Sequence, residues 1–243
     1  MNQRRIAAIV VGVLLATGLV GLSPAAGANA AAPARYAPKI DPRDFGGAVD
    51  NPWFPLVPGT RWTYAVKTAH GTEANTVEVT HETREILGVT SVVVHDVVRV
   101  GDRVTEETFD WYAQDRRGNV WYFGEDTKEF AKNGKVSTEG SWESGVDNAY
   151  PGIIMKAKPR PGVTYREEYY RGHAEDTARV LGVHAAVKVR AGSYRDAVKT
   201  QELTRLEPKI VEHKYYARGV GIVLEVLVKG GVERAELTDY STP

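Results

Sequence analysis

Strand-like alternation of apolar and polar residues, rather than a helical repeat, runs through most of the chain after residue 50. Residues 76–80 alternate with a period of two, and residues 90–100 are rich in valine. Period-two alternation and β-branched residues are typical of strands, and sustained helical periodicity is scarce here. The pattern predicts an all-β fold with minor α content.

Short turn signals separate the predicted strands. Glycine, asparagine and aspartate tolerate the positive φ that two-residue hairpin turns require. We therefore expect antiparallel strands in a curved sheet of half-barrel or sandwich-like shape. The dipeptides that mark the turns are Gly101-Asp102, Asn133-Gly134 and Gly230-Gly231.

Two motifs occur twice in the chain. A Pro-Gly pair followed by an aromatic residue three positions after the glycine occurs at residues 58–62 and 161–165. An aromatic pair followed by alanine occurs at residues 111–113 and 215–217, at nearly the same distance from the first motif. Such self-similarity is typical of repeated structural units.

The repetition predicts an internal duplication of two tandem β units. We expect a first unit at residues 51–125, a connector at 126–160 and a second unit at 161–243. Each unit would be a curved antiparallel sheet that is too small to close a core alone. Chance recurrence of common strand and turn residues is the alternative.

The amino terminus has the order of a secretory signal. Arg4 and Arg5 precede an uncharged apolar run at residues 6–22, and a small-x-small site follows at residues 28–30. We expect residues 1–30 to be a cleaved signal peptide, although a retained anchor is the alternative. Residues 31–50 lack periodicity and are expected to form a flexible leader. The predicted location is secreted or in the cell envelope.

Charge and cysteine content narrow the functional classes. The chain has 31 basic and 31 acidic residues, so it lacks the positive charge that nucleic acid or an anionic membrane surface would attract. It has no cysteine, which excludes thiol catalysis, thiolate metal sites and disulfides. No phosphate-binding loop or nucleophile elbow is present, and we expect no cofactor.

A metal site is a weak possibility at one acidic turn. His173, Glu175 and Asp176 lie close together in the sequence, and hard carboxylate oxygens suit Ca²⁺. The spacing has no regular pattern of ligands, so a solvated acidic turn explains the same residues. We therefore predict no metal centre and keep these three residues as weak candidates.

The connector is the expected ligand-facing surface. A long irregular segment in a compact domain is usually functional or disordered, and its rings argue against disorder. Paired aromatic residues on strands place one ring on each face of a sheet, and an aromatic-lined concavity suits an apolar, lipid-like or sugar-like ligand. The candidate residues are Trp142, Glu143, Asp147, Tyr150, Met155, Trp121 and Tyr215.

Four stretches carry a resemblance to a known group of proteins. They are residues 51–55, 110–115, 118–125 and 213–217. Through them the chain resembles a family of uncharacterised exported bacterial proteins common in actinobacteria, over nearly all of residues 51–240. More loosely, it is similar to half-barrel proteins of the cell envelope, some of which carry lipid. The resemblance implies a ligand-binding role by fold alone.

These observations support three hypotheses about function. The first is an exported binding or envelope accessory protein, not an enzyme, with a small apolar ligand or an envelope partner. The second is a hydrolase or lyase that uses a carboxylate pair. The carboxylates available to it are Glu143, Asp147, Glu168, Glu175 and Asp176. The third is a structural or interaction protein of the cell surface.

Overall fold

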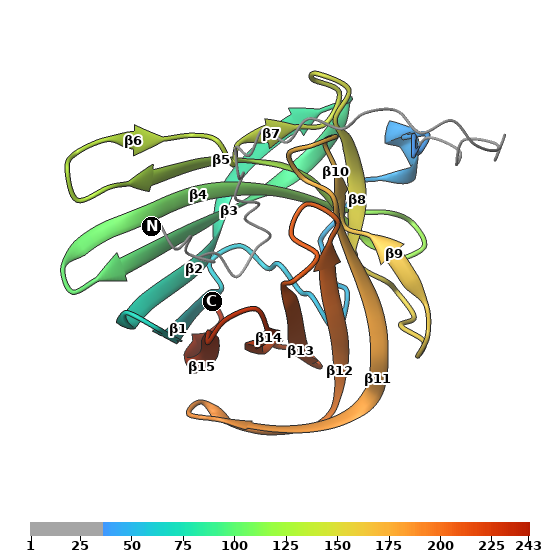
Figure 1. Ribbon diagram of the computed structural model, residues 1–243. Coiled ribbons are helices and arrows are strands. Elements are labelled where there is room, and N and C mark those ends of the chain that lie inside the picture. The colour runs from blue at the N-terminus through green and yellow to red at the C-terminus, as the bar shows by residue number, and fades with distance from the viewer. Residues whose placement is uncertain (1–35) are drawn as a thin grey trace, which may run out of the picture.

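One curved antiparallel sheet makes up most of the protein. The structure is a computed structural model that describes residues 36–243 (Figure 1). Within that range the single helical element is a 3-10 turn, η1, at Pro42–Asp44. The predicted all-β fold with little helix is confirmed. The predicted signal peptide lies outside the described residues.

The sheet is built from fifteen strands. Its order is β10-β8-β5-β4-β3-β2-β1-β15-β14-β13-β12-β11-β9, with β6 and β7 pairing with β5 beside this path. The strands are β1 (Arg61–Thr68), β2 (Gly71–Ile86), β3 (Val89–Val100), β4 (Arg103–Gln114), β5 (Val120–Phe130), β6 (Val136–Ser137), β7 (Trp142–Glu143), β8 (Tyr150–Met155), β9 (Thr164–Arg166), β10 (Glu168–Tyr169), β11 (Asp176–Val189), β12 (Gly192–Thr204), β13 (Val211–Ala217), β14 (Gly221–Lys229) and β15 (Arg234–Ser241).

All three predicted hairpin turns are confirmed. Gly101-Asp102 joins β3 to β4, Asn133-Gly134 lies between β5 and β6, and Gly230-Gly231 follows β14. Gly101, in the first of these turns, has a φ of 59°, a left-handed conformation that glycine adopts without a steric penalty. The local turn chemistry therefore fixes where these strands reverse.

The two edges of the sheet almost meet. β9 pairs with β11 at one end of the sheet, whereas β10 pairs with β8 at the other, yet only Glu167 separates β9 from β10 in the chain. The Glu167 N–H donates to Asp176 O at 2.9 Å, which continues the β9–β11 pairing up to the residue that precedes β10. The sheet therefore curls into a nearly closed, barrel-like form, as Figure 1 shows around β8–β11.

Apolar side chains pack on both faces of the sheet. The larger cluster fills the concave interior, and a smaller cluster on the outer face includes Val93, Trp111 and Phe123. Consecutive residues of a strand point to opposite faces, so Trp111 packs outside while Tyr112 packs inside.

The described part of the expected leader is packed against the sheet. Phe45 contacts the ring of Phe123 edge-on at 5.6 Å and that of Trp121 at 6.2 Å, and Ile40 joins the same outer cluster. The Arg116 N–H donates to Asp44 O at 2.8 Å. Ring contacts, apolar packing and a backbone hydrogen bond therefore connect this part of residues 36–50 to the sheet.

The two halves of the chain share several backbone features. The Gly59 N–H donates to Val79 O at 2.8 Å, and the Gly162 N–H donates to Val180 O at 2.9 Å. The β4–β5 and β13–β14 hairpins each have a bulge, after Trp111 and after Tyr215 respectively. The expected connector contributes β6, β7 and β8 to the same sheet.

Candidate functional site

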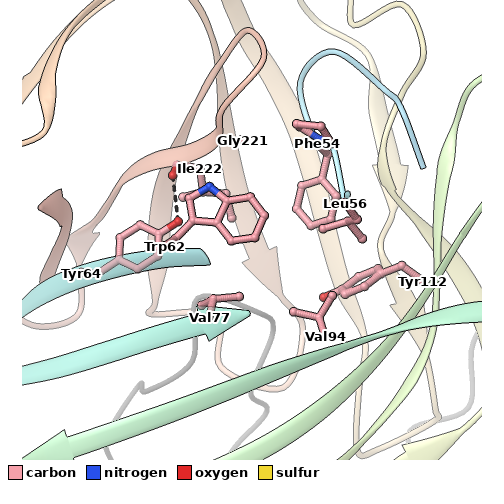
Figure 2. Close-up of a pocket in the computed structure, with 10 residues that line it drawn as sticks. Phe54, Leu56, Trp62, Tyr64, Val77, Val94, Tyr112, Gly221 and Ile222 are labelled. Carbon is pink, nitrogen blue, oxygen red and sulfur yellow. Dashed lines mark hydrogen bonds between the residues drawn. The ribbon is translucent and has the colours of Figure 1, made fainter. Parts of the chain in front are cut away.

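An apolar pocket opens into the concave interior between β1, β14 and residues 54–56. Its cavity volume is about 30 Å³, and the wider space of about 350 Å³ around it includes open solvent at the mouth. Figure 2 shows Trp62 and Tyr64 on one side of this space and Phe54 and Tyr112 on the other. The residues that line it are Phe54, Pro55, Leu56, Trp62, Tyr64, Val77, Val94, Tyr112, Gly221 and Ile222.

Backbone carbonyls hold two of the pocket rings in place. The Trp62 indole N–H donates to Val220 O at 2.7 Å, and the Tyr64 hydroxyl donates to Ile222 O at 2.9 Å (Figure 2). Buried tyrosine and tryptophan need such partners for their polar atoms. Because these atoms are already satisfied, the rings offer apolar surface to the pocket.

The segment that carries Phe54 is tied to turns in both halves of the chain. The Asn51 side-chain amide donates to Gly118 O at 2.8 Å, and the Gly219 N–H donates to Pro52 O at 2.7 Å. Phe54 then packs edge-on against Tyr112, with the ring centres 5.4 Å apart. The pocket wall is therefore preformed rather than a loose loop.

Polar side chains lie next to the pocket on three neighbouring strands. Asn75 on β2, Asp96 on β3 and Asp110 on β4 are each two residues from a pocket residue on the same strand. Residues two apart on a strand share a face and are separated by roughly 6.6 Å. All three are buried, so a polar layer underlies the apolar pocket.

Two carboxylates of this layer are only half satisfied. The Tyr122 hydroxyl donates to Asp110 Oδ1 at 2.8 Å, and the Asn75 amide donates to Asp96 Oδ1. Asp96 Oδ2 and Asp110 Oδ2 are buried and have no hydrogen-bond partner among the described residues. Burial raises the pKa of Asp96 to about 7, and burial together with the charge of Asp96 raises the pKa of Asp110 well above its usual value.

A buried lysine lies in the interior on β13, in the second half of the chain. Lys214 Nζ on β13 is 2.6 Å from Glu202 Oε2, 3.8 Å from Glu225 Oε2 and 4.0 Å from Glu212 Oε2. Burial alone would lower the pKa of Lys214, but these carboxylates raise it well above its usual value. The lysine is therefore charged and neutralises part of the acidic interior.

The buried acids predict an unusual dependence of stability on pH. Asp96 and Asp176 both have a pKa of about 7 in the folded chain, raised by burial, against a usual value near 4. Between these pH values the folded state binds more protons than the unfolded state, so stability falls as pH rises from 4 to 7 and then levels off. Each group contributes a slope of up to about 1.4 kcal/mol per pH unit.

Urea unfolding at pH 5 and pH 8 measures this effect. We expect the higher midpoint at pH 5, and Asp96→Asn should reduce the difference because it removes one titrating group. Asp115, whose pKa is lowered by hydrogen bonds from Asn119 and Trp121 despite partial burial, titrates below this window. A midpoint that rises from pH 5 to pH 8 would contradict the assignment.

The expected ligand residues do not come together in one site. Trp142 is buried in the interior core, with its ring edge-on to Tyr122 at 5.3 Å, and Met155 is fully buried in the same cluster. Asp147 is exposed in a turn with a φ of 49°, and Tyr150 is half-buried. Thus Trp142 and Met155 fill the core, and neither lines the pocket.

Three other expected residues lie on the outer face of the sheet. The Trp121 indole N–H donates to Asp115 Oδ2 at 2.9 Å, and Tyr215 is half-buried. Glu143 pairs with Arg84, with N and O 2.5 Å apart, at the partly exposed surface. Neither Glu143 nor Asp147 therefore forms a pair with a buried carboxylate.

The weak metal candidates have structural partners. His173 stacks on Tyr170, with ring centres 4.2 Å apart, and Glu175 Oε1 accepts from the Gly172 N–H at 2.9 Å. Asp176 is largely buried, and Glu168 is completely buried. In residues 36–243 no group of three His, Cys, Asp or Glu side chains is arranged to hold a metal ion.

The pocket and its polar layer were missed by sequence reasoning for different reasons. Phe54, Trp62 and Tyr64 belong to the aromatic pairs visible in the sequence, but nothing local shows that they converge. Asp110 stands beside Trp111 in a strand with both faces buried, so alternation does not reveal the inward direction of its carboxylate. The repeated hairpin motif was the one available signal for Lys214.

Two solved structures align with most of the chain. One is a Bacteroides fragilis protein that is thought to be exported and has a YmcC-like fold. It is 16% identical, with a TM-score of 0.47, and the match covers 78% of this chain and 99% of that one. The other, a Parabacteroides distasonis protein thought to be a lipoprotein, is 11% identical, with a TM-score of 0.45 and coverage of 78% and 98%.

The remaining comparisons find no relatives. No protein-family model matches the sequence, and no curated protein matches it. The actinobacterial grouping expected from the sequence is not supported. Across residues 36–243, no helix combines the length and the apolar character that a membrane crossing requires.

Proposed function

We propose that this protein is an exported binding protein that holds a small apolar molecule, or the apolar part of a larger one, in the pocket beside Trp62. One observation carries the proposal. Four rings and several aliphatic side chains line a preformed space, and the polar atoms of Trp62 and Tyr64 are bonded to backbone carbonyls. Ligand sites are typically concave and apolar with a few polar groups, and this space has that character.

The amino terminus supports export. Arg4 and Arg5, the apolar run at 6–22 and the small residues at 28–30 have the order of a cleaved secretory signal. A binding role outside the cytoplasm, in the cell envelope or the medium, is compatible with a chain that has no cysteine to oxidise.

We also propose that the interior arose by internal duplication. Matching Gly-to-Val hydrogen bonds at Gly59 and Gly162, and bulges after Trp111 and Tyr215, support this origin. The pocket then lies between the two repeats, because Phe54 contacts Tyr112 of the first and Tyr216 of the second. A site shared by two units is a common place for a ligand.

Filling the pocket tests the proposed function. Val94 lines the pocket, and Val94→Phe should place a ring in the space that the ligand needs. The probe is N-phenylnaphthylamine, a neutral apolar dye whose fluorescence increases in apolar surroundings. We expect the wild-type protein to bind the dye and the variant to bind it at least about tenfold more weakly.

A matched control separates this effect from general changes. Val228 on β14 is exposed, so Val228→Phe adds the same ring outside the pocket and should leave dye binding unchanged. Thermal unfolding shows whether Val94→Phe is tolerated, since a ring forced into a tightly packed core typically costs about 1–3 kcal/mol. Equal dye binding by the wild type and Val94→Phe would refute the pocket as the site.

A further inference from the structure

The interior of the protein carries far more acid than base. Among the buried side chains of residues 36–243 there are eight carboxylates and one basic group, Lys214. A charge removed from water is costly unless an opposite charge or several hydrogen bonds accompany it. The position of this ammonium group therefore shows which of the buried acids it neutralises.

Lys214 and Asp110 occupy matching positions in two similar hairpins. Lys214 on β13 is in register with Glu225 on β14, and Asp110 on β4 is in register with Glu125 on β5. The strand-pairing bulge follows one residue further along in both hairpins. Where one hairpin places an ammonium group 2.6 Å from Glu202, the other therefore places a carboxylate.

The acids of the first half retain unused binding capacity. Asp96 is 2% exposed and Asp110 is 0% exposed, and the Oδ2 atom of each has no hydrogen-bond partner in the described part of the chain. Asp96 follows Val94 by two residues on β3, and Asp110 precedes Tyr112 by two residues on β4. Both acids therefore share the inner face of the sheet with these pocket residues. Two half-satisfied carboxyl groups therefore lie next to residues of the pocket wall, although they do not line the pocket itself.

The pocket rings add a second preference for positive charge. Phe54, Trp62, Tyr64 and Tyr112 surround the space in Figure 2. The face of an aromatic ring is electron-rich and attracts cations, most strongly when water is excluded, and cages of such rings bind ammonium ligands. The pocket rings and the neighbouring Asp96 and Asp110 therefore favour the same kind of ligand head.

We propose, resting on the proposed function, that the pocket takes an amphipathic cation whose ammonium group lies between the rings and the Asp96 and Asp110 carboxylates. The apolar part of this ligand packs against Leu56 and Val77. The ammonium group of the ligand would neutralise Asp96 and Asp110, as the ammonium group of Lys214 neutralises Glu202 and Glu225.

Three probes of equal chain length test the preference for charge. Octyltrimethylammonium, octanol and octanoate each have an eight-carbon straight chain, with the carboxyl carbon counted in octanoate, and each is titrated calorimetrically below its micellar concentration. The pH is held at about 8, above the pKa of about 7 for Asp96. We expect the ammonium to bind about tenfold more tightly than the alcohol, and octanoate to bind more weakly than either.

Single substitutions place the preference at the carboxylates. Asp96→Asn keeps a side chain that can accept from the Asn75 amide but removes the charge that Asp96 carries at pH 8, so ammonium binding should fall to the level of the alcohol. Asp126→Asn is the matched control, because Asp126 is exposed on β5. If Asp96→Asn does not fold, Asp110→Asn provides a second test from the neighbouring strand, because a bound ammonium group would favour the ionised form of Asp110, whose pKa is otherwise raised well above its usual value by burial.

The possible outcomes separate the two proposals. Equal binding of ammonium and alcohol by the wild type, with both lost in Val94→Phe, would overturn the cation preference and leave the apolar pocket intact. Ammonium binding that Val94→Phe does not weaken would overturn both. Asp96→Asn and Asp126→Asn losing ammonium affinity alike would show that the attraction is a general surface effect and would overturn the cation preference.

Discussion

Replacing Gly152 with alanine should destabilise the protein by at least about 3 kcal/mol, because the added methyl group would collide with the backbone. A Cβ at this position would lie 2.2 Å from the carbonyl carbon of Glu167 and 2.5 Å from the amide nitrogen of Glu168. Backbone atoms cannot move aside as the end of a side chain can. The substitution should therefore separate β8 from β10, where the sheet approaches closure, and lower the urea midpoint sharply.

Gly182 offers a matched control in another strand. It lies in β11, and a Cβ there would meet no atom within 4 Å. Neither glycine has a positive φ, so alanine is not strained at either position for conformational reasons. We expect Gly182→Ala to be neutral or slightly stabilising, since alanine restricts the unfolded chain. Similar urea midpoints for the two variants would mean that the close approach of β8 and β10 at Gly152 does not contribute to stability.

Replacing Lys214 with methionine should cost about 3–5 kcal/mol, because it removes the charge that neutralises buried carboxylates. The ammonium lies within 4.0 Å of Glu202, Glu212 and Glu225. Methionine has a similar shape, so the change tests the charge rather than the volume. Urea unfolding measures the loss, and adding Glu202→Leu should recover part of it by removing one uncompensated acid.

Lys199 is the control for the loss of a lysine in the neighbouring strand. It lies in β12 opposite Tyr215, with its ammonium 5.2 Å from the centre of that ring, and it is half-buried rather than enclosed by acids. Lys199→Met should change stability by less than about 1 kcal/mol. If Lys214→Met changed the stability as little as Lys199→Met, the buried acids would be protonated and would not need the positive charge of Lys214.

Local patterns predicted the strands and turns well. The valine-rich run at 90–100 lies within β3, and the predicted Gly101-Asp102 turn follows that strand. Both could be predicted because strand alternation and positive φ are properties of a few adjacent residues. The closure of the sheet depends instead on Gly152 and Glu167, which come from segments with no distinctive pattern. A close backbone approach between distant segments leaves no signal except an isolated glycine.

The direction of the Trp142 ring could not be predicted from sequence for a related reason. Trp142 was expected to face a ligand because it lies in a glycine-rich connector, but its pairing with Glu125 on β5 turns the ring into the core. The side to which a short strand directs its side chains is set by register, which is a long-range property. The same holds for Asp96 and Lys214, whose charges gave no sign of burial in sequence.

The most direct test of the central claim is native mass spectrometry of the protein purified from the cells that make it. The wild type and Val94→Phe, which differ at one pocket residue, are measured side by side. We predict that a wild-type population carries one additional small molecule, released on activation as an amphipathic cation, and that Val94→Phe lacks it. A wild-type protein that binds no such molecule even when octanol and octyltrimethylammonium are supplied would contradict the account.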